Sequence, residues 1–332
     1  MQIKQEDLTR AAELLSALRE EIAKAVVGQS YAVDQTLVAL LASGHVLIEG
    51  VPGLGKTLLV RSLAKAMSLD YARVQFTPDL MPSDITGYTV LDAAARGDAG
   101  SSVGSLRVHR GPVFTHLLLA DEINRAPAKT QSALLEVMQE FQVTLEGQTL
   151  ALPRPFMVLA TQNPVDTEGT YPLPEAQLDR FLLKINIDFP SHEDEAAIVR
   201  RTTEGQAGDQ FPLGALTPQM DERTVLSLQR MASYVRVDER VLDYAVRITR
   251  TTRNWPGLSG GAGPRGAIAL VRAARANALL QARDFITPDD VKRNVLPALR
   301  HRVQLAPDAQ LEGRQVDELL LMALQSVEAP RL

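Results

Sequence analysis

The chain has 332 residues, of which 45% are hydrophobic and 23% charged, and its formal net charge is −5. This length is enough for one large domain or two moderate ones with a sizeable core. The acidic balance and the lack of long basic runs argue against a general nucleic-acid-binding surface. The absence of cysteine excludes disulfides, thiolate metal sites and cysteine nucleophiles.

The first strong pattern is an apolar strand, a glycine-rich turn and a helix. Residues 45–49 form the apolar run, GVPGLGKT follows at 50–57, and 58–67 has the pattern of a helix. The turn fits G-x-x-x-x-G-K-[ST], in which backbone N–H groups and the helix N-terminus bind phosphate. A chance lysine beside a flexible turn is the plainer explanation, but the flanking strand and helix argue against it. We expect Lys56 to reach the β- and γ-phosphates of a nucleotide and the Thr57 hydroxyl to ligate Mg²⁺.

Strands and helices alternate over the first part of the chain. The predicted strands are 45–49, 72–76, 117–120, 156–161 and 182–187, and one predicted helix covers 128–140. This alternation indicates an α/β fold with a mainly parallel sheet covered by helices. After residue 190 the pattern is helical, with helix-start signals at Ser191 and Thr287. We therefore predict a nucleotide-binding core at 1–190 and a helical domain at 191–332.

Polar groups follow two of these strands. The run LLLADEINR at 117–125 places Asp121 and Glu122 at the end of an apolar strand, and ATQNP at 160–164 places Asn163 at the end of another. Ligands bind at the carboxyl edge of such sheets, so Asp121 is a candidate Mg²⁺ ligand and Glu122 a candidate to polarise the attacking water. Asn163 could orient that water, or it could simply cap the turn before Pro164.

Two stretches rich in small residues interrupt these patterns. Residues 92–105 are small and polar, and residues 256–266 contain five of the chain's glycines. The simplest interpretation of each is a surface loop. The five histidines have no metal-ligand spacing, which favours structural roles.

Four segments in this order resemble the MoxR family of AAA+ ATPases. They are GVPGLGKT, LLLADEINRAPAKTQSALLEVMQE, ATQNPVDTEGTYPLPEAQLDRF and GPRGAI, and the resemblance runs from about residue 20 to 305. It implies an AAA+ P-loop core with a parallel sheet, followed by a C-terminal helical lid. It also implies a homo-oligomeric ring, usually a hexamer, that hydrolyses ATP with Mg²⁺ between subunits.

The resemblance also implies roles for particular residues. Glu122 is then the catalytic base and Asn163 the sensor that follows it. Arg180, in LDRF, is the arginine finger that reaches a neighbour's γ-phosphate, and Arg265, in GPRG, is the second sensor on the lid. From the residues alone, an internal ion pair for Arg180 and a capping or loop contact for Arg265 remain alternatives. The nucleotide contacts implied are Val26, Val27, Gly50, Pro52, Gly53, Leu54, Gly55, Lys56, Thr57 and Leu58, with Thr57 and Asp121 at the metal. Arg125 is a further candidate for a contact between subunits.

The family belongs to a branch of AAA+ proteins with inserted hairpins. Residues 78–114 fit the insert after the second strand, and 141–156 fit a hairpin whose turn lies at Glu146-Gly147. These elements are expected to face the client. MoxR relatives commonly act with a protein that carries a von Willebrand factor A domain, and they remodel or mature a protein client.

Three alternatives remain open. A magnesium-chelatase ATPase subunit shares the branch and the type of partner. A DNA-acting AAA+ motor is disfavoured by the acidic balance, the 5% aromatic content and the absence of an appended DNA-binding motif. A non-catalytic nucleotide switch is disfavoured by the presence of Lys56, Asp121, Glu122 and Asn163 together. No apolar run approaches the roughly 18 residues of a membrane span, and no signal-peptide pattern is present, so we expect a cytoplasmic protein.

Overall fold

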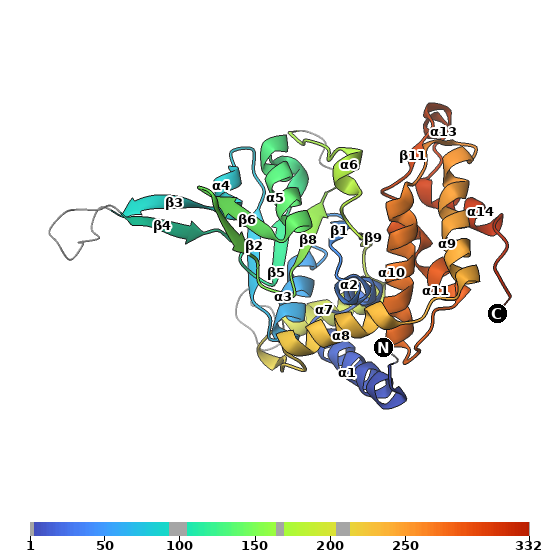
Figure 1. Ribbon diagram of the computed structural model, residues 1–332, viewed down its shortest axis with the longest axis horizontal. Coiled ribbons are helices and arrows are strands. Elements are labelled where there is room, and N and C mark those ends of the chain that lie inside the picture. The colour runs from blue at the N-terminus through green and yellow to red at the C-terminus, as the bar shows by residue number, and fades with distance from the viewer. Residues whose placement is uncertain (1–2, 93–104, 164–168, 204–212, 332) are drawn as a thin grey trace.

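The computed structural model describes residues 3–92, 105–163, 169–203 and 213–331. A five-stranded sheet with helices around it lies in one part of the molecule, and a bundle of helices from the C-terminal third lies beside it (Figure 1). The five predicted strands are confirmed, each within two residues of the observed bounds. They are β1 (Val46–Glu49), β2 (Tyr71–Gln75), β5 (Leu117–Asp121), β8 (Met157–Gln162) and β9 (Leu183–Asn186).

All five strands are parallel and lie in the order β2-β5-β8-β1-β9. The strand that ends at Asp121 therefore pairs with the strand that leads to Asn163, and the latter pairs with the strand that enters the glycine-rich turn. Because parallel strands share a direction, their carboxyl ends meet at one edge of the sheet. This edge collects the polar groups that the sequence singled out.

The sheet is buried on both faces. Along β5, Leu117 and Leu119 belong to one apolar cluster, and Leu118 and Ala120 belong to another; β8 alternates in the same way. Successive side chains of a strand point to opposite faces, so each strand contributes to two cores. The first core includes residues of α1 (Gln5–Ala23), α2 (Ser30–Leu41) and α3 (Lys56–Ala66), and the second includes residues of α4 (Pro82–Thr86) and α5 (Ala128–Glu140).

Two antiparallel hairpins are attached to this core. β3 (Gly87–Asp92) pairs with β4 (Ser105–Arg110), and β6 (Gln142–Leu145) pairs with β7 (Gln148–Ala151). The predicted turn at Glu146-Gly147 is confirmed, because both residues have the positive φ that such two-residue turns require, 46° and 79°. The β3–β4 hairpin projects away from the body of the molecule (Figure 1). Most of the predicted loop at 92–105 lies outside the described residues.

The chain after β9 is mainly helical. One short helix, α6 (Glu175–Leu178), precedes β9. The α-helices that follow β9 in the described residues are α7 (His192–Thr203), α8 (Glu222–Tyr234), α9 (Glu239–Thr251), α10 (Pro264–Leu280), α11 (Pro288–Arg293), α12 (Val295–Leu299), α13 (Pro307–Leu311) and α14 (Val316–Gln325). The predicted helix starts are confirmed: Ser191 Oγ accepts from the Asp194 amide, and Thr287 forms a capping box with Asp290. Both α2 and α10 contact α8, so a domain boundary near residue 190 stays a prediction.

The simple loop interpretation of residues 256–266 is wrong in part. Leu258–Gly260 form strand β10, which pairs with β11 (Gln304–Leu305), and α10 begins at Pro264. A Cβ at Gly261 would lie 2.4 Å from the Arg253 Cα, so the backbone there packs too closely for any side chain. At Gly261, glycine is therefore required by the close approach of the Arg253 backbone. Among the described residues, no helix is both long and apolar enough to cross a bilayer.

His45 is buried where β1 begins and has a structural role. Its Nδ1 accepts from the Val158 amide at 3.0 Å, and its Nε2 lies 3.0 Å from the Met138 carbonyl oxygen. The ring is therefore neutral, with its proton on Nε2. Burial lowers the pKa of His45 to about 4, although the bond to Met138 opposes this and nearby Arg272 and Arg154 add to it.

We expect this histidine to make stability fall in mild acid. The unfolded chain binds the proton near pH 6.5 and the folded chain only near pH 4, so the contribution is intact above pH 6.5 and is lost as the pH falls toward 4. The full shift corresponds to about 3 kcal/mol. Urea unfolding at pH 7.0 and 4.5 should show a smaller acid-induced loss in His45→Gln than in the parent. Equal losses in the two proteins would contradict the assignment.

Candidate active site

The turn between β1 and α3 is shaped to hold an anion. Gly53 and Gly55 have φ of +86° and +75°, and a Cβ built on either would meet nothing within 4 Å. A Cβ at Gly50 would instead lie 2.7 Å from the Ile187 carbonyl oxygen, which shows how closely the loop packs on the end of β9. Glycine thus permits the left-handed backbone and leaves open space above the loop, as a phosphate-binding turn requires.

Lys56 extends back across this turn. Its Nζ donates to the Gly50 carbonyl oxygen at 2.5 Å, so the ammonium group lies over the loop that it follows. Burial lowers the pKa of Lys56, and Asp121, Glu122 and Glu49 oppose that shift. Lys56 lines a cavity of about 410 Å³ together with Pro52, Gly53, Leu54, Gly55, Thr57, Leu58, Arg73, Gln75, Asp121, Glu122, Thr161 and Asn163.

The two carboxylates at the end of β5 are held in different ways. Asp121 Oδ1 accepts from the Thr161 hydroxyl at 2.6 Å, and its Oδ2 accepts from Arg73 Nη2 at 2.7 Å. Glu122 has a φ of +56°, a conformation that few residues other than glycine adopt. Its amide donates to the same Thr161 hydroxyl at 2.8 Å, which fixes the backbone from which both carboxylates project.

The Glu122 side chain has two partners of its own. Its Oε2 accepts from Gln75 Nε2 at 2.8 Å and lies 3.0 Å from Arg125 Nε. Arg125, the candidate for a contact between subunits, is thus bound to Glu122 within the chain. These contacts fix the position of the Glu122 carboxylate, the group expected to polarise the attacking water.

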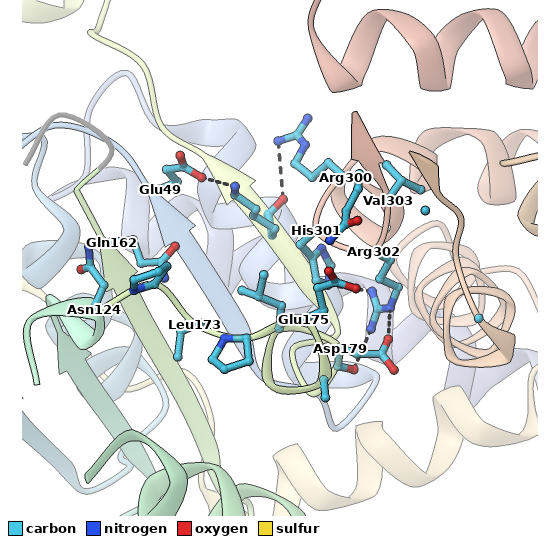
Figure 2. A pocket seen from close by; sticks show the side chains of 18 of the residues that line it. Glu49, Asn124, Gln162, Leu173, Glu175, Asp179, Arg300, His301, Arg302 and Val303 are labelled. Atoms are coloured by element: carbon cyan, nitrogen blue, oxygen red, sulfur yellow. Dashed lines mark hydrogen bonds and ion pairs between the residues drawn. The ribbon is translucent and has the colours of Figure 1, made fainter. Parts of the chain in front are cut away.

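Asn163 follows β8, next to the strand that carries the carboxylates. The residue is buried and lines both the 410 Å³ cavity and a larger one of about 1050 Å³ that extends toward the helical region. The expected adjacency of the two strands is confirmed. Figure 2 shows the larger cavity, with Gln162 from β8 on one side and Arg300, His301 and Arg302 on the other.

Three residues of the P-loop cavity were missed by the sequence analysis. They are Arg73 and Gln75, on alternate positions of β2, and Thr161 in β8. The one available signal was that polar residues alternate toward the end of a predicted strand. Only the strand order shows that β2 lies beside β5, with Gln75 in register with Asp121.

Arg180 and Arg265 lie elsewhere. They line a separate cavity of about 300 Å³, together with Arg272, Arg302, Asp179 and the residues just before β1, and among the described residues it shares no lining residue with the P-loop cavity. Arg180 Nη1 donates to the Leu135 carbonyl oxygen at 2.8 Å, and Arg265 Nη1 lies 3.4 Å from Asp179 Oδ2. Within the chain, Arg180 thus binds a backbone carbonyl group and Arg265 lies at ion-pair distance from Asp179, so these contacts differ from the ion pair and the capping contact given as alternatives.

The position of this arginine cavity relative to the sheet is informative. Ser43, Gly44 and His45 precede β1, and Leu182 precedes β9, so the cavity lies at the amino edge of the parallel sheet. The P-loop follows β1 and lies at the carboxyl edge. Strands of this length separate the two edges by about 15 Å. Arg180 and Arg265 therefore lie at the amino edge of the sheet, and the P-loop of the same chain lies at its carboxyl edge.

The segment at 26–29 lies near the P-loop through the chain beyond β9. Val26 is buried and Val27 half-buried, and Gln29 Nε2 donates to the Asp188 carbonyl oxygen at 3.1 Å. Asp188 lines a small cavity of about 190 Å³ with Gly50, Val51, Leu54 and Phe189. An apolar group bound there would lie beside the phosphate loop, which is consistent with a base pocket.

Comparison with known proteins agrees with this geometry. Residues 45–183 match the ATPase family associated with various cellular activities (AAA), and residues 250–321 match the AAA lid domain. "Chaperone MoxR1" of Mycobacterium tuberculosis is 41% identical over 327 residues, with 94% of this chain and 81% of that protein covered. The chain belongs to the MoxR family of AAA+ ATPases.

Two other comparisons cover almost the whole chain. "Uncharacterized protein YeaC" of Bacillus subtilis is 43% identical over 98% of this chain and 97% of its own length. A solved structure from Cytophaga hutchinsonii has a TM-score of 0.87 and 38% identity, with 98% of both chains covered. The magnesium-chelatase 38 kDa subunit of Acidiphilium rubrum is a distant relative at 26% identity. As a member of this family the chain hydrolyses ATP, and its α/β core with a helical lid is confirmed.

Proposed function

We propose that the chain forms a homo-oligomeric, Mg²⁺-dependent ATPase ring of six subunits, in keeping with the family, in which each ATP site is completed by the neighbouring subunit. The observation that carries this proposal is the separation of the two cavities on opposite edges of the sheet. Lys56 and the carboxylates lie at one edge, and Arg180 and Arg265 lie at the other. A head-to-tail ring brings the arginine edge of one subunit to the P-loop edge of the next.

We assign the binding steps to residues of the P-loop edge. The backbone N–H groups of residues 53–58 bind the phosphates, Lys56 neutralises the β- and γ-phosphates, and the 26–29 segment borders the base. Thr57 and Asp121 fit a hard cation, because both offer oxygen ligands and line the same cavity. Bound Mg²⁺ would neutralise charge that develops on the transferring phosphoryl group. Asp121 must then exchange its contact with Arg73.

We assign the hydrolytic steps to Glu122 and Asn163 in one subunit and to two arginines in the next. The Glu122 carboxylate first gives up its contacts with Gln75 and Arg125. It then accepts the proton of the attacking water, which Asn163 orients. Arg180 and Arg265 of the neighbour stabilise the transition-state charge. Arg265 was expected to be a sensor on the lid, and its position beside Arg180 supports action on the neighbour's nucleotide.

We propose that hydrolysis drives remodelling or maturation of a protein client, together with a partner that has a von Willebrand factor A domain. The MoxR relatives support a chaperone role, since one of them is named a chaperone. The β3–β4 hairpin is the proposed client contact. Tyr88 and Val90 are 51% and 42% exposed on it, and Tyr88 stacks on His109 with ring centroids 5.3 Å apart. Residues 97–102 lie outside the described residues.

Replacing Tyr88 by alanine is expected to weaken client or partner binding about tenfold, as loss of an aromatic contact at an interface does. The unstimulated ATPase rate should stay within about twofold of the parent, because Tyr88 lies outside both cavities. Tyr234→Ala, at the end of α8, is the matched control, since Tyr234 is 44% exposed. The measurement is the ATPase rate with and without the client or partner. If it stimulates Tyr88→Ala and Tyr234→Ala equally, the β3–β4 hairpin is not its contact site.

Capture of partners tests the proposed function. Tagged Glu122→Gln protein is incubated with cell extract in ATP and Mg²⁺, and bound proteins are identified by mass spectrometry against a Lys56→Ala control. Specific enrichment of a von Willebrand factor A protein supports the proposal. Enrichment of chelatase subunits would favour the magnesium-chelatase motor, and a salt-sensitive shift on DNA would favour a DNA-acting motor. If the parent protein hydrolyses ATP no faster than Lys56→Ala, a non-catalytic nucleotide switch is favoured.

A further inference from the structure

The segment that carries Arg180 is held by the lid, here the residues matched at 250–321. Residues 179–182 lead into β9, which is the edge strand of the sheet, so one side of this segment has no neighbouring strand. The chain after α12 runs along that side. Arg300 Nη1 donates to the Lys184 carbonyl oxygen at 3.5 Å, and Arg302 reaches the residues before it. Lid side chains thus bind backbone carbonyl groups along this free edge.

Arg302 makes most of these contacts. Its side chain is 3% exposed, and its Nε donates to Asp179 Oδ1 at 2.7 Å. Its Nη2 donates to the Phe181 carbonyl oxygen at 2.7 Å and to that of Asp179 at 3.2 Å, while Nη1 donates to the Leu182 carbonyl oxygen at 3.2 Å. The guanidinium therefore binds the backbone on both sides of Arg180. Figure 2 shows Arg302 and Asp179 in contact with each other at one side of the larger cavity.

Two neighbouring lid residues reinforce this attachment. Arg265 Nη1 lies 3.4 Å from the second oxygen of the Asp179 carboxylate, and His301 Nε2 lies 3.0 Å from the Phe181 carbonyl oxygen. His301 is buried and its pKa is lowered, by burial first and then by Arg302, so the ring is neutral. Arg180 itself is bound to the core through Leu135. The 179–182 segment is thus bound from two sides. The lid binds its carbonyl groups and the Asp179 carboxylate, while the core buries Phe181 and accepts the Leu182 amide at the His45 carbonyl oxygen, 2.8 Å away.

We propose that Arg302 is a positioning residue for the neighbour's hydrolysis: it binds the 179–182 segment to the lid, so that the position of the lid sets the placement of Arg180. This inference rests on the proposed action of Arg180 across the subunit interface. A buried guanidinium with four acceptors in one segment resists relative movement, because each broken bond leaves a buried donor unpaired. A displacement of the lid is then delivered to the neighbouring site through Asp179.

The test uses Arg302→Met, which keeps the length of the side chain and removes its donors. In the homo-oligomer, kcat should fall about 10²-fold, as small misplacements of catalytic groups cause, while KM for ATP stays within about twofold. Arg300→Met is the matched control, because Arg300 is also buried, lies two residues away and makes no contact with residues 179–182 among those described. It should retain kcat within about threefold.

Mixed oligomers provide the decisive readout. Arg302→Met subunits keep an intact P-loop edge, and Glu122→Gln subunits keep an intact arginine edge. A 1:1 mixture should therefore hydrolyse ATP at least about fivefold faster than the sum of its components. A mixture of Arg302→Met with Arg180→Ala should gain nothing, because both lack a placed finger. If Arg302→Met does not fold, Asp179→Asn is used in the same mixtures, since Asp179 is 29% exposed and better tolerates change.

The outcomes separate this inference from the function on which it rests. Gain with Glu122→Gln and no gain with Arg180→Ala supports it. If Arg180→Ala is rescued by Glu122→Gln but Arg302→Met is not, Arg302 acts within its own subunit and the inference is overturned, while the shared ATP site stands. If neither is rescued, action across the interface fails, and the role of Arg302 fails with it.

Discussion

Glu122→Gln is expected to bind ATP as tightly as the parent and to hydrolyse it about 10³-fold more slowly. The carboxylate lies at the end of β5, one residue beyond Asp121, and the amide of Glu122 is fixed by Thr161 at 2.8 Å. Glutamine keeps the shape of the side chain and cannot accept the proton of the attacking water. General bases of this kind contribute about 10²–10⁴-fold.

Two measurements check this result. Steady-state phosphate release gives kcat, and titration with a fluorescent ATP analogue gives affinity. Lys56→Ala is the control with the opposite signature, because Lys56 lies over the phosphate loop and its loss should weaken binding itself. Glu122→Gln protein that retained a tenth of the parental kcat would exclude Glu122 as the base.

Arg180→Ala should also lose about 10³-fold in kcat, as removal of an arginine finger does. The physical reason differs from that for Glu122, because Arg180 lies at the amino edge of the sheet, away from the P-loop of its own chain. In the proposed ring, its guanidinium stabilises charge on a nucleotide held by another subunit. Nucleotide affinity should therefore change little, and the protein should still assemble.

Mixing of variants distinguishes this role from a local one. Arg180→Ala and Glu122→Gln subunits each lack what the other supplies, so a 1:1 mixture should recover hydrolysis well above the sum of the two proteins. A mixture of Lys56→Ala with Glu122→Gln should recover none, because both have a defective P-loop edge. Identical behaviour of the two mixtures would leave Arg180 with a structural role only.

The P-loop and the strands could be predicted from sequence because their signals are local. The glycines of residues 50–57, the lysine that follows them and the apolar runs at 117–120 and 156–161 each reflect the backbone or burial of their own segment. The observed helix α5 has the predicted bounds, and the turn at Glu146-Gly147 has the predicted positive φ values. Segments of this kind depend little on the remainder of the fold.

Other features depended on contacts between distant segments. Arg73 and Gln75 are ordinary strand residues until β2 is placed beside β5, where they bind Asp121 and Glu122. The glycines of 256–266 are compatible with a loop until Gly261 is found against the Arg253 backbone. Arg302 has no motif at all, because three of its partners in the 179–182 segment are backbone carbonyl groups, which every sequence has.

The sequence by itself determined that this chain is an α/β ATPase of the MoxR family with a phosphate loop and an acidic strand end. The tertiary structure alone decided that Arg180 and Arg265 lie on the opposite edge of the sheet from Lys56, and that the lid holds the segment before β9. The reason is physical. Backbone preference and burial are recorded locally in the chain, whereas the order of parallel strands and the partners of buried arginines arise only when distant segments pack together.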